Sequence, residues 1–320
     1  MDIGVVGCGF VGTAVYEGLK KHHNLNNYDK AIDKDCTCGS MKELAECSDI
    51  IFVCVPTPME SDGSCHTGIV EDVVKELDEC SQDKILVLKS TIIPGTTQRL
   101  NSKYKNNTIT FSPEFLTEAN SIDDFKNQTR IILGGDRKGT NKLRVMFSKA
   151  FPTAHIIKTD STYAEMIKYL TNNFLTVKVA FANEMYKICE RLRIDYDKVV
   201  EYATLDERLG PSHWGVPGPD GDFGFGGHCF PKDIEAMISL TEDLQTPNFV
   251  LKGAKDTNDE IRMERDWEGM KGRAVIDEVK HFADGFHEGR WEDDIENKYT
   301  HDGDGKPLDS ILPNLNESRP

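Results

Sequence analysis

The sequence predicts an α/β protein in which a doubly wound parallel sheet precedes a mostly helical second domain built on a long spine helix. Two observations predict this fold. Up to residue 160 the chain alternates short apolar runs with amphipathic stretches, which is typical of a parallel sheet with helices on both faces. From Tyr163 to Arg193 it holds helix formers without Gly or Pro. We therefore expect domains at 1–160 and 161–265, and a short helix with an acidic, flexible tail at 266–320.

Local patterns predict the individual elements. Five apolar runs predict strands of the sheet: Ile3–Val6, Ile50–Val55, Ile85–Leu88, Ile109–Phe111 and Ile131–Leu133. Asp160-Ser161-Thr162 predicts the N-cap of the long helix. The length of this helix, roughly 45 Å, exceeds the diameter of one small domain, so we expect it to form the spine of the second domain and a dimer interface. Gly210–Gly227 predicts a loop because it is rich in Gly and Pro, and Pro231 begins another helix. A last amphipathic stretch covers Ala274–Phe282.

Composition excludes several classes of function. A formal net charge of −16 argues against nucleic acid and acidic membranes as partners, since both require Lys and Arg to neutralise phosphate. Nine cysteines without a Cys-x-x-Cys pair or a His/Cys cluster predict neither a disulfide framework nor a metal site. We expect a cytoplasmic protein, because no apolar run is long enough to cross a bilayer and the first residues lack the basic start of a signal peptide.

The first strand runs directly into Gly7-Cys8-Gly9-Phe10-Val11-Gly12, which opens a helix. In this position the glycines permit a tight turn, and the helix N-terminus donates N–H groups to a pyrophosphate. Asp29 follows Leu25–Tyr28 at the place of the acidic residue that binds a ribose hydroxyl, so the pattern predicts a Rossmann-type NAD site. Lys30 and Lys34 leave NADP open, and glycines that merely turn the chain are the structural alternative.

Polar side chains stand at the ends of later predicted strands. Thr57 lies in Val-Pro-Thr-Pro and Thr91 ends Lys-Ser-Thr. Ser-Pro-Glu-Phe-Leu-Thr-Glu places Glu114 and Glu118 after another strand. Ligands of open α/β sheets bind in the crevice outside such strand ends. Either threonine could instead cap a helix, and Glu114 could be an exposed loop carboxylate.

Cys229 ends a glycine-rich segment, residues 223–229, which we call the cysteine loop, and a predicted helix follows it. The positive end of that helix and the Lys232 ammonium both favour a thiolate, which is a nucleophile. Lys168 and Asn172 are four residues apart on the long helix and so share one face. The structural alternatives are a buried apolar cysteine, a solvated lysine and a packing amide.

Taken together, these motifs resemble the UDP-glucose 6-dehydrogenase family, within the wider group of nucleotide-sugar dehydrogenases, over residues 1–262. The match comprises Gly-Cys-Gly-Phe-Val-Gly, Val-Pro-Thr-Pro, Lys-Ser-Thr, Ser-Pro-Glu-Phe-Leu-Thr-Glu, the Lys168/Asn172 pair, Asp-Glu-Arg-Leu-Gly at 206–210 and the cysteine loop. It implies two successive NAD-dependent oxidations of one sugar carbon, from alcohol to aldehyde to acid, the second through a thiohemiacetal and a thioester. UDP-glucose is the expected substrate, and a homodimer through the long helix is the expected assembly.

The resemblance also implies three sets of site residues. Catalysis falls to Cys229, Lys168, Asn172, Asp233, Glu114 and Thr91. NAD binding falls to Gly7, Gly9, Phe10, Val11, Gly12, Asp29, Lys34, Thr57, Thr91 and Glu118. Substrate binding falls to Glu114, Phe115, Leu116, Lys168, Asn172, Arg208, Phe225 and Gly226. Glu114 would act in thioester hydrolysis, and Arg208 would reach the substrate, often across a dimer.

The implied catalytic roles agree with the chemistry of the side chains. Cys229 would be the nucleophile that forms the tetrahedral adduct with the aldehyde. Lys168, helped by Asn172, would stabilise the developing oxyanions. Asp233, with Thr91, would position or activate water.

Two features depart from the family pattern and keep other functions open. Family members continue with a third α/β domain that grips the nucleotide, and the residues after 265 lack its pattern. The segment Trp214–Gly221 also lengthens the loop before the cysteine. We therefore retain a β-hydroxyacid dehydrogenase, which performs one oxidation without a cysteine, and a non-catalytic NAD-binding subunit as alternatives.

Overall fold

Seven strands form one sheet in the computed structural model, which describes residues 1–31 and 33–277. The strand order is β2-β1-β3-β4-β5-β6-β7. The strands are β1 (Asp2–Val6), β2 (Asn24–Tyr28), β3 (Ile50–Val53), β4 (Ile85–Leu88), β5 (Thr108–Phe111), β6 (Arg130–Gly134) and β7 (His155–Thr159). All five predicted runs are strands, although β3 ends two residues before the predicted Val55. β2 and β7 were not among the predicted strands, because both are partly exposed edge strands without a continuous apolar run.

The sequence pattern predicted a parallel sheet. The observed sheet is parallel except between β5 and β6. β1 to β5 pair in parallel, but β6 pairs with β5 in antiparallel fashion through Phe111 and Gly134, and β7 runs parallel to β6. The connection from β5 to β6 contains α5 (Ser121–Lys126), which packs against α1 (Phe10–Leu19). The chain therefore re-enters the sheet at the end where β5 left it, and no crossover joins the two strands.

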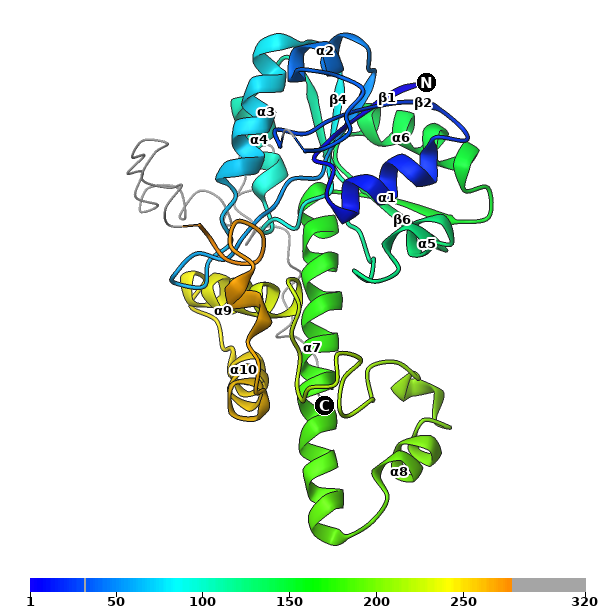
Figure 1. Cartoon of the computed structure of the whole chain (residues 1–320). Coiled ribbons are helices and arrows are strands. Elements are labelled where there is room, and N and C mark those ends of the chain that lie inside the picture. Colours follow the sequence, from blue (N-terminus) through cyan, green and yellow to red (C-terminus); the bar gives the residue numbers. More distant parts are fainter. Residues whose placement is uncertain (32, 278–320) are drawn as a thin grey trace, which may run out of the picture. The chain divides into compact units, whose positions relative to one another are not determined.

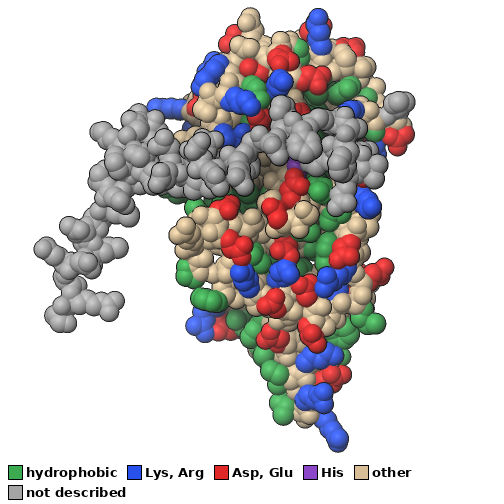
Figure 2. All heavy atoms as spheres, turned by 90° about the vertical axis from the view of Figure 1, so that its left-hand side faces the viewer, with side chains coloured by type: hydrophobic (Ala, Val, Ile, Leu, Met, Phe, Trp, Pro, Cys, Tyr) green, Lys and Arg blue, Asp and Glu red, His purple; other side chains and the backbone are tan. Residues whose placement is uncertain are grey.

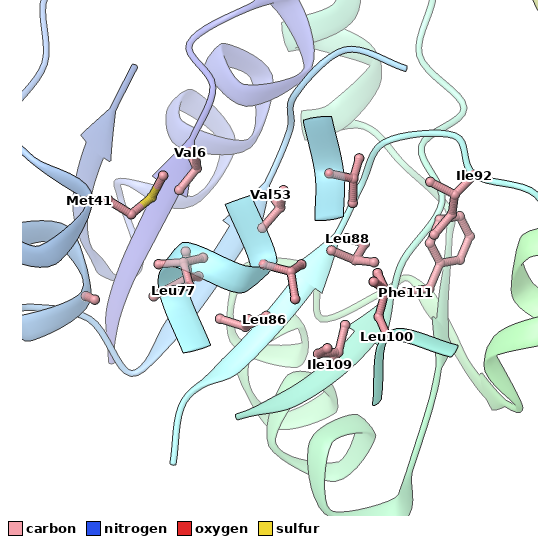
Figure 3. Close-up of a cluster of buried hydrophobic side chains, with 14 of the residues drawn as sticks. Val6, Met41, Val53, Leu77, Leu86, Leu88, Ile92, Leu100, Ile109 and Phe111 are labelled. Atoms are coloured by element: carbon pink, nitrogen blue, oxygen red, sulfur yellow. The ribbon is translucent and has the colours of Figure 1, made fainter. Parts of the chain in front are cut away.

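Helices cover both faces of the sheet, which makes the strands apolar on both sides. One face packs beneath α2 (Met41–Glu46), α3 (Gly68–Cys80) and α4 (Thr96–Lys103), and Figure 3 shows side chains such as Val53, Leu86 and Leu88 in that layer. Their neighbours along the strands, including Phe52 and Val87, face the layer under α1, α5 and α6 (Arg137–Ala150). Because β1, β3, β4 and β5 pair in parallel, their carboxyl ends lie along one edge of the sheet.

A long helix, α7 (Ser161–Leu192), follows the sheet and carries the helical part of the chain (Figure 1). The Asp160 side chain accepts a hydrogen bond from the Thr162 N–H at 2.9 Å, so the predicted N-cap is confirmed. Further helices are α8 (Tyr196–Ala203), α9 (Phe230–Asp243) and α10 (Phe249–Ile261), with short 3-10 helices η1 (Glu207–Leu209) and η2 (Asp266–Gly269). α9 and α10 both pack against α7, which also touches β6 and α4. One helix therefore contacts both the sheet and the helical part.

Acidic and basic side chains alternate over α9 and α10 on the face shown in Figure 2. Lys255, for example, lies 2.7 Å from Asp259 and 3.4 Å from Glu235. Across the described ranges, no helix combines the length and the apolar composition required to span a bilayer.

The end of the described chain forms a short bridge with a loop near the sheet. Met59 donates its N–H to the Ala274 carbonyl oxygen at 2.8 Å and accepts from the Ile276 N–H at 3.0 Å. Residues 274–277 are not helical, and the rest of the stretch predicted at Ala274–Phe282, like the acidic tail, lies outside the described residues.

Candidate active site

The glycine turn between β1 and α1 leaves open space beside the helix N-terminus. Gly7 has a φ of +91°, and a Cβ there would collide with the Cys54 carbonyl oxygen. A Cβ on Gly12 would collide with the Gly7 carbonyl oxygen, whereas one on Gly9 would meet no atom within 4 Å. Gly9 is the N-cap of α1, and no side chain from the described residues caps that helix. The N–H groups of its first turn are therefore open to an anion.

Asp29 lies beside this turn at the end of β2. Its Oδ2 accepts a hydrogen bond from the Cys8 N–H at 2.6 Å, and its Oδ1 accepts from the Ala31 N–H at 2.8 Å. A carboxylate oxygen has a second lone pair, so both oxygens can still accept a ribose hydroxyl. Lys34 is exposed on the segment that follows.

Thr57 and Thr91 do not cap helices, which was their alternative reading. The N-cap of α3 is Thr67 and that of α4 is Gly95. Both threonines are buried, and both lie beside Cys65, whose thiol donates to the Thr91 carbonyl oxygen at 3.6 Å. Both threonines therefore lie in the buried layer at the carboxyl ends of β3 and β4.

Lys168 of α7 and Glu114, which follows β5, form a buried ion pair. The Lys168 Nζ lies 2.8 Å from the Glu114 Oε1 and 2.8 Å from its carbonyl oxygen, and the two side chains are 4% and 6% exposed. Burial disfavours both charges, but the attraction between them outweighs it, so the pKa of Glu114 is lowered and that of Lys168 is raised. Lys168 is consequently a fixed cation at neutral pH.

A cavity of about 320 Å³ lies beside this ion pair. Glu114, Phe115 and Leu116, three residues expected to bind substrate, line it. The Leu116 N–H donates to the Glu114 Oε2 at 2.7 Å, and the Phe115 ring centroid is 5.7 Å from the Lys168 Nζ. The loop after β5 thus holds the carboxylate against the lysine and borders an open volume.

Asp233, in the first turn of α9, joins that helix to α7. Its Oδ2 accepts from the Asn172 Nδ2 at 2.6 Å, and its Oδ1 accepts from the Lys232 Nζ at 2.6 Å. Burial disfavours the Lys232 ammonium, yet Asp233 raises its pKa overall. Lys168 and Asn172 therefore both point from one face of α7 into the same buried polar cluster.

Cys229 is the N-cap of α9 and lies within electrostatic reach of this cluster. Burial, with Glu114 adding to it, raises the pKa of the thiol to about 12, against the opposing influence of Lys168 and Lys232. The predicted thiolate is therefore wrong for the unliganded chain. The physical reason is mainly the burial of the sulfur, and the carboxylates of Glu114 and Asp233, which pair with the two lysines, add to it.

His228 connects Cys229 to the glycine turn. Its Nδ1 lies 3.3 Å from the Cys229 Sγ, and its ring packs edge-on against Phe10 with the centroids 4.8 Å apart. Burial and nearby positive charge lower the pKa of His228, so the ring is neutral near pH 7. Glu118 lies 3.9 Å from the same Nδ1 and 3.2 Å from Arg273, whose guanidinium carbon is 6.0 Å from the Phe10 ring centroid. The cysteine loop thus rests against the first turn of α1.

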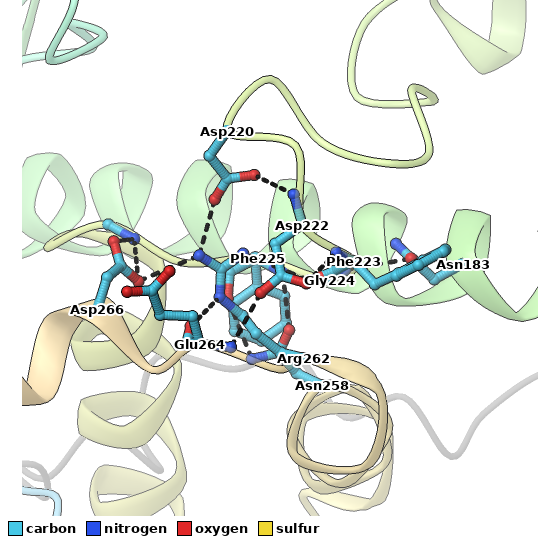
Figure 4. A network of polar contacts seen from close by, with 11 residues as sticks. Asn183, Asp220, Asp222, Phe223, Gly224, Phe225, Asn258, Arg262, Glu264 and Asp266 are labelled. Carbon is cyan, nitrogen blue, oxygen red and sulfur yellow. Dashed lines mark hydrogen bonds and ion pairs between the residues drawn. The ribbon is translucent and has the colours of Figure 1, made fainter.

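Arg262, directly after α10, holds the cysteine loop in place (Figure 4). Its Nη2 donates to Asp220 at 2.7 Å and to Asp266 at 3.1 Å, and Asp266 also accepts from the Gly227 N–H at 3.0 Å. A Cβ on Gly226 would collide with the guanidinium. The packing of Arg262 therefore requires a glycine at position 226.

Two residues expected to bind substrate lie apart from this cluster. Phe225 is 4% exposed within the helical core, and both its N–H and its carbonyl oxygen bond to Asn258. Arg208 lies in η1, which follows α8, and its 88% exposed side chain pairs with Asp206. Within the described chain it contacts none of the catalytic candidates.

Comparison with known proteins identifies the family. Residues 34–151 match the NAD binding domain of the UDP-glucose/GDP-mannose dehydrogenase family, and residues 162–260 match its central domain. YtcA of Bacillus subtilis, a protein named as a UDP-glucose 6-dehydrogenase, is 30% identical over 296 residues, which cover 81% of this chain and 68% of YtcA. The chain belongs to the UDP-glucose/GDP-mannose dehydrogenase family.

Other members of the family extend the comparison. The UDP-glucose 6-dehydrogenase of Rickettsia conorii is 32% identical over 216 residues, which cover 66% of this chain and 49% of that protein. The structure of a UDP-glucose dehydrogenase from the archaeon Pyrobaculum islandicum superimposes with a TM-score of 0.73 at 27% identity, over 81% of this chain and 68% of that one. The chain thus spans between about half and about two thirds of the length of these relatives.

NAD is the cofactor of this family member, and its sheet is of the Rossmann type. The glycine turn fits that cofactor in this structure, because the space beside Gly9 and the uncapped N–H groups of α1 suit a pyrophosphate, and the Asp29 carboxylate suits a ribose.

Three polar residues at the site of this family member were not among the predicted site residues. Lys89 is buried at the end of β4, where its Nζ donates to the Pro113 carbonyl oxygen at 3.1 Å and burial lowers its pKa to about 8. Its place in Lys-Ser-Thr was an available signal, as was the position of His228 beside Cys229. Arg273 gave no signal, because it comes from a segment without a pattern and only the fold brings it to Glu118.

Alanine substitutions at two glycines should separate folding from cofactor binding. Gly9→Ala should melt like the parent but bind NAD at least about tenfold more weakly, because its methyl group enters the space left for the pyrophosphate. Gly12→Ala should lose about 1–3 kcal/mol of stability, since its methyl group overlaps the Gly7 carbonyl oxygen. Thermal unfolding and calorimetric titration with NAD measure both effects. Equal stability of the two variants would contradict the packing role of Gly12.

Proposed function

We propose that this family member is a UDP-glucose 6-dehydrogenase, which oxidises the primary alcohol of the nucleotide sugar to the uronic acid in two NAD-dependent steps through Cys229. One observation carries the proposal: Cys229, Lys168 and Asp233 interact electrostatically in a cluster whose cysteine loop rests on the glycine turn. When bound, NAD accepts the two electrons released in each oxidation. The chain itself supplies the nucleophile, the cation and the proton acceptors.

The alcohol must lose its hydroxyl proton in the first oxidation. Within the described chain, Lys168 is already charged and paired, so it stabilises the alkoxide rather than removing the proton. The Asp233 carboxylate, held by Asn172 and Lys232, is suited to orient a water that takes the proton. The first step yields the aldehyde.

The second oxidation begins when the Cys229 sulfur attacks the aldehyde carbon and a C–S bond forms. The thiol proton passes to the His228 Nδ1, which lies 3.3 Å away and is neutral. Lys168 stabilises the oxyanion of the thiohemiacetal. Oxidation of this adduct gives a thioester on Cys229.

Hydrolysis of the thioester releases the acid. Water attacks the acyl carbon, the C–S bond breaks, and the departing sulfur regains its proton from His228. The Glu114 carboxylate lies beside Lys168 in the same cluster, where it can accept the proton of the attacking water. Thr91, in the floor of the site, is the further candidate for orienting that water.

The substrate is proposed from the cavity and from the named activity of the relatives. Glu114, Phe115 and Leu116 border a volume of about 320 Å³, and Glu114 is the proposed catalytic residue that lines it. YtcA and the Pyrobaculum protein are both named for UDP-glucose. Arg208 and the backbone around Phe225 and Gly226 remain candidates for holding the nucleotide.

The decisive experiment measures stoichiometry. Purified protein with excess NAD and limiting UDP-glucose should yield two NADH and one UDP-glucuronate for each UDP-glucose. Parallel assays with GDP-mannose and UDP-N-acetylmannosamine test the choice of sugar. One NADH per substrate would indicate a single-oxidation β-hydroxyacid dehydrogenase, and no turnover despite NAD binding would indicate a non-catalytic subunit.

We propose that the chain forms a homodimer through α7. We also expect the protein to be located in the cytoplasm. Large apolar side chains are exposed along this helix: Tyr163, Met166, Leu170, Phe174, Phe181, Ile188 and Leu192. A second copy would bury them, and it would bring the exposed Arg208 of one chain toward the other.

A charge placed on this helix should break the dimer. Phe174→Glu should halve the mass measured by light scattering at micromolar protein, because Phe174 is 64% exposed within the apolar series. Met263→Glu, which changes an 87% exposed residue outside α7, is the matched control and should leave the mass unchanged. A parent protein that is monomeric at this concentration would refute the proposal.

A further inference from the structure

Two thiols meet at the glycine turn. The Sγ atoms of Cys8 and Cys36 are 3.7 Å apart, although the residues are 28 positions apart in the chain. Cys8 stands between Gly7 and Gly9, and Cys36 lies on the segment between β2 and α2. Both are partly exposed, so a small oxidant can reach them.

One side of this pair is fixed and the other can adjust. The Cys8 N–H is bound to the Asp29 carboxylate at 2.6 Å, and the preceding Gly7 packs against the Cys54 carbonyl oxygen. Cys36 belongs to neither a helix nor a strand. A disulfide requires the sulfurs to approach to about 2.05 Å, so the segment that carries Cys36 must make most of the movement.

That segment is attached to the ribose end of the cofactor site. The Asn27 Nδ2 donates to the Cys8 Sγ at 3.4 Å and to the Asp35 carbonyl oxygen at 3.2 Å, and the Asn27 Oδ1 accepts from the Thr37 N–H at 2.9 Å. The segment begins directly after Asp29. A movement of Cys36 toward Cys8 therefore breaks the Asn27 contacts and shifts the surroundings of the ribose-binding carboxylate.

We propose that Cys8 and Cys36 form a reversible disulfide whose formation blocks NAD binding. The oxidant is a peroxide. One sulfur of the pair attacks a peroxide oxygen, the O–O bond breaks, and one water leaves with a sulfenic acid on the sulfur. The second sulfur then attacks the first, the S–S bond forms as the S–O bond breaks, and a second water leaves. The two thiols lose two electrons in total, the peroxide gains them, and a dithiol reductant reverses the reaction.

The chain contains a matched control pair. The Sγ atoms of Cys38 and Cys47 are 3.8 Å apart, and Cys47 is the C-cap of α2, where its thiol donates to the Leu44 carbonyl oxygen. Neither residue contacts the glycine turn in the hydrogen bonds of the described chain. Oxidation of this pair should therefore leave the cofactor site intact.

The test compares NAD binding before and after treatment with hydrogen peroxide. All proteins carry Cys229→Ser, so oxidation of the catalytic thiol does not contribute, and binding is read by calorimetry rather than by turnover. In this background the oxidised protein should bind NAD at least about tenfold more weakly, and dithiothreitol should restore the affinity. Peptide mapping by mass spectrometry should find a Cys8–Cys36 link in the oxidised sample.

Two further variants assign the effect to one pair. Cys36→Ser should bind NAD normally and keep its affinity after peroxide, whereas Cys47→Ser should lose affinity as the background does. Unchanged NAD affinity in a sample that carries the Cys8–Cys36 link would overturn the proposal, as would absence of the link after full thiol oxidation. Because every readout is independent of sugar oxidation, failure here is distinguishable from failure of the proposed dehydrogenase function.

Discussion

Cys229→Ser should lower the rate of uronic acid formation by about 10³-fold or more. A serine hydroxyl at the N-cap of α9 is a far weaker nucleophile than a thiol, and its ester would hydrolyse more slowly than a thioester. NAD binding and overall fold should be preserved, because in the described part of the chain it is His228, the neighbour of Cys229, whose ring packs on the glycine turn at Phe10. The measurement is NADH released per UDP-glucose, followed over time and combined with product analysis.

Cys65→Ser is the matched control for this prediction. Cys65 is the other thiol near Lys232 and Asp233, but it bonds to the Thr91 backbone beneath the site. Its serine variant should retain two NADH per sugar. Loss of the second oxidation in Cys65→Ser, with normal turnover in Cys229→Ser, would show that Cys65 is the nucleophile and would refute the mechanism.

The pKa of Cys229 adds a pH dependence to the same experiment. Burial raises the pKa of the thiol to about 12, so at neutral pH the protonated form dominates. Oxidation of the aldehyde therefore relies on transfer of the thiol proton to neutral His228, so its rate should change little from pH 7.5 to pH 9 and fall at acidic pH as His228 becomes protonated, and the residual activity of Cys229→Ser should not follow this decrease.

Lys168→Met should remove both activity and a large part of the stability. The substitution leaves the Glu114 carboxylate buried without its cation, which costs about 3–5 kcal/mol of unfolding free energy. It also removes the positive charge that stabilises the oxyanions, so turnover should fall by about 10²–10³-fold. Urea unfolding and steady-state kinetics measure the two effects separately.

The pH dependence of the stability loss identifies its cause. In the parent, Lys168 lowers the pKa of Glu114, so the ion pair stabilises the fold above the ordinary carboxylate pKa and is lost as pH falls. In Lys168→Met the buried carboxylate has its pKa raised instead. The stability deficit relative to the parent should therefore shrink as pH falls from 7 to 5.

Two variants control the Lys168 experiment. Lys168→Met combined with Glu114→Gln leaves no buried charge, so it should recover much of the stability but not the activity. Lys187→Met changes an exposed lysine of the same helix and should alter stability by less than about 0.5 kcal/mol. A single Lys168→Met variant as stable as the parent would mean that the ion pair does not form in solution.

The strands show what apolar patterning can predict. β1, β3, β4, β5 and β6 are buried on both faces and therefore read as continuous apolar runs. β7 is a partly exposed edge strand, and its sequence His-Ile-Ile-Lys-Thr resembles many surface segments. The antiparallel pairing of β6 was equally unpredictable, because β6 is a buried apolar strand like its parallel neighbours and its residues do not specify its direction.

The residues of the candidate site likewise fall into those that the sequence could predict and those that it could not. The glycine turn, Asp29, Lys168, Asn172 and Cys229 could be named from motifs, because backbone turns and helical spacing are local properties. The partners of these residues could not. Arg262, directly after α10, donates to the Phe223 carbonyl oxygen of the cysteine loop, and Arg273 reaches Glu118 over more than 150 positions of chain.

The sequence by itself determined the glycine turn, the cap and length of α7, and the order of the chemical groups along the chain, since each depends on residues a few positions apart. Only the tertiary structure decided the charge state of Cys229, the pairing of Lys168 with Glu114 and the meeting of Cys8 with Cys36. These depend on burial and on distances of a few ångströms between segments remote in sequence, and Coulomb interactions and desolvation change steeply over such distances.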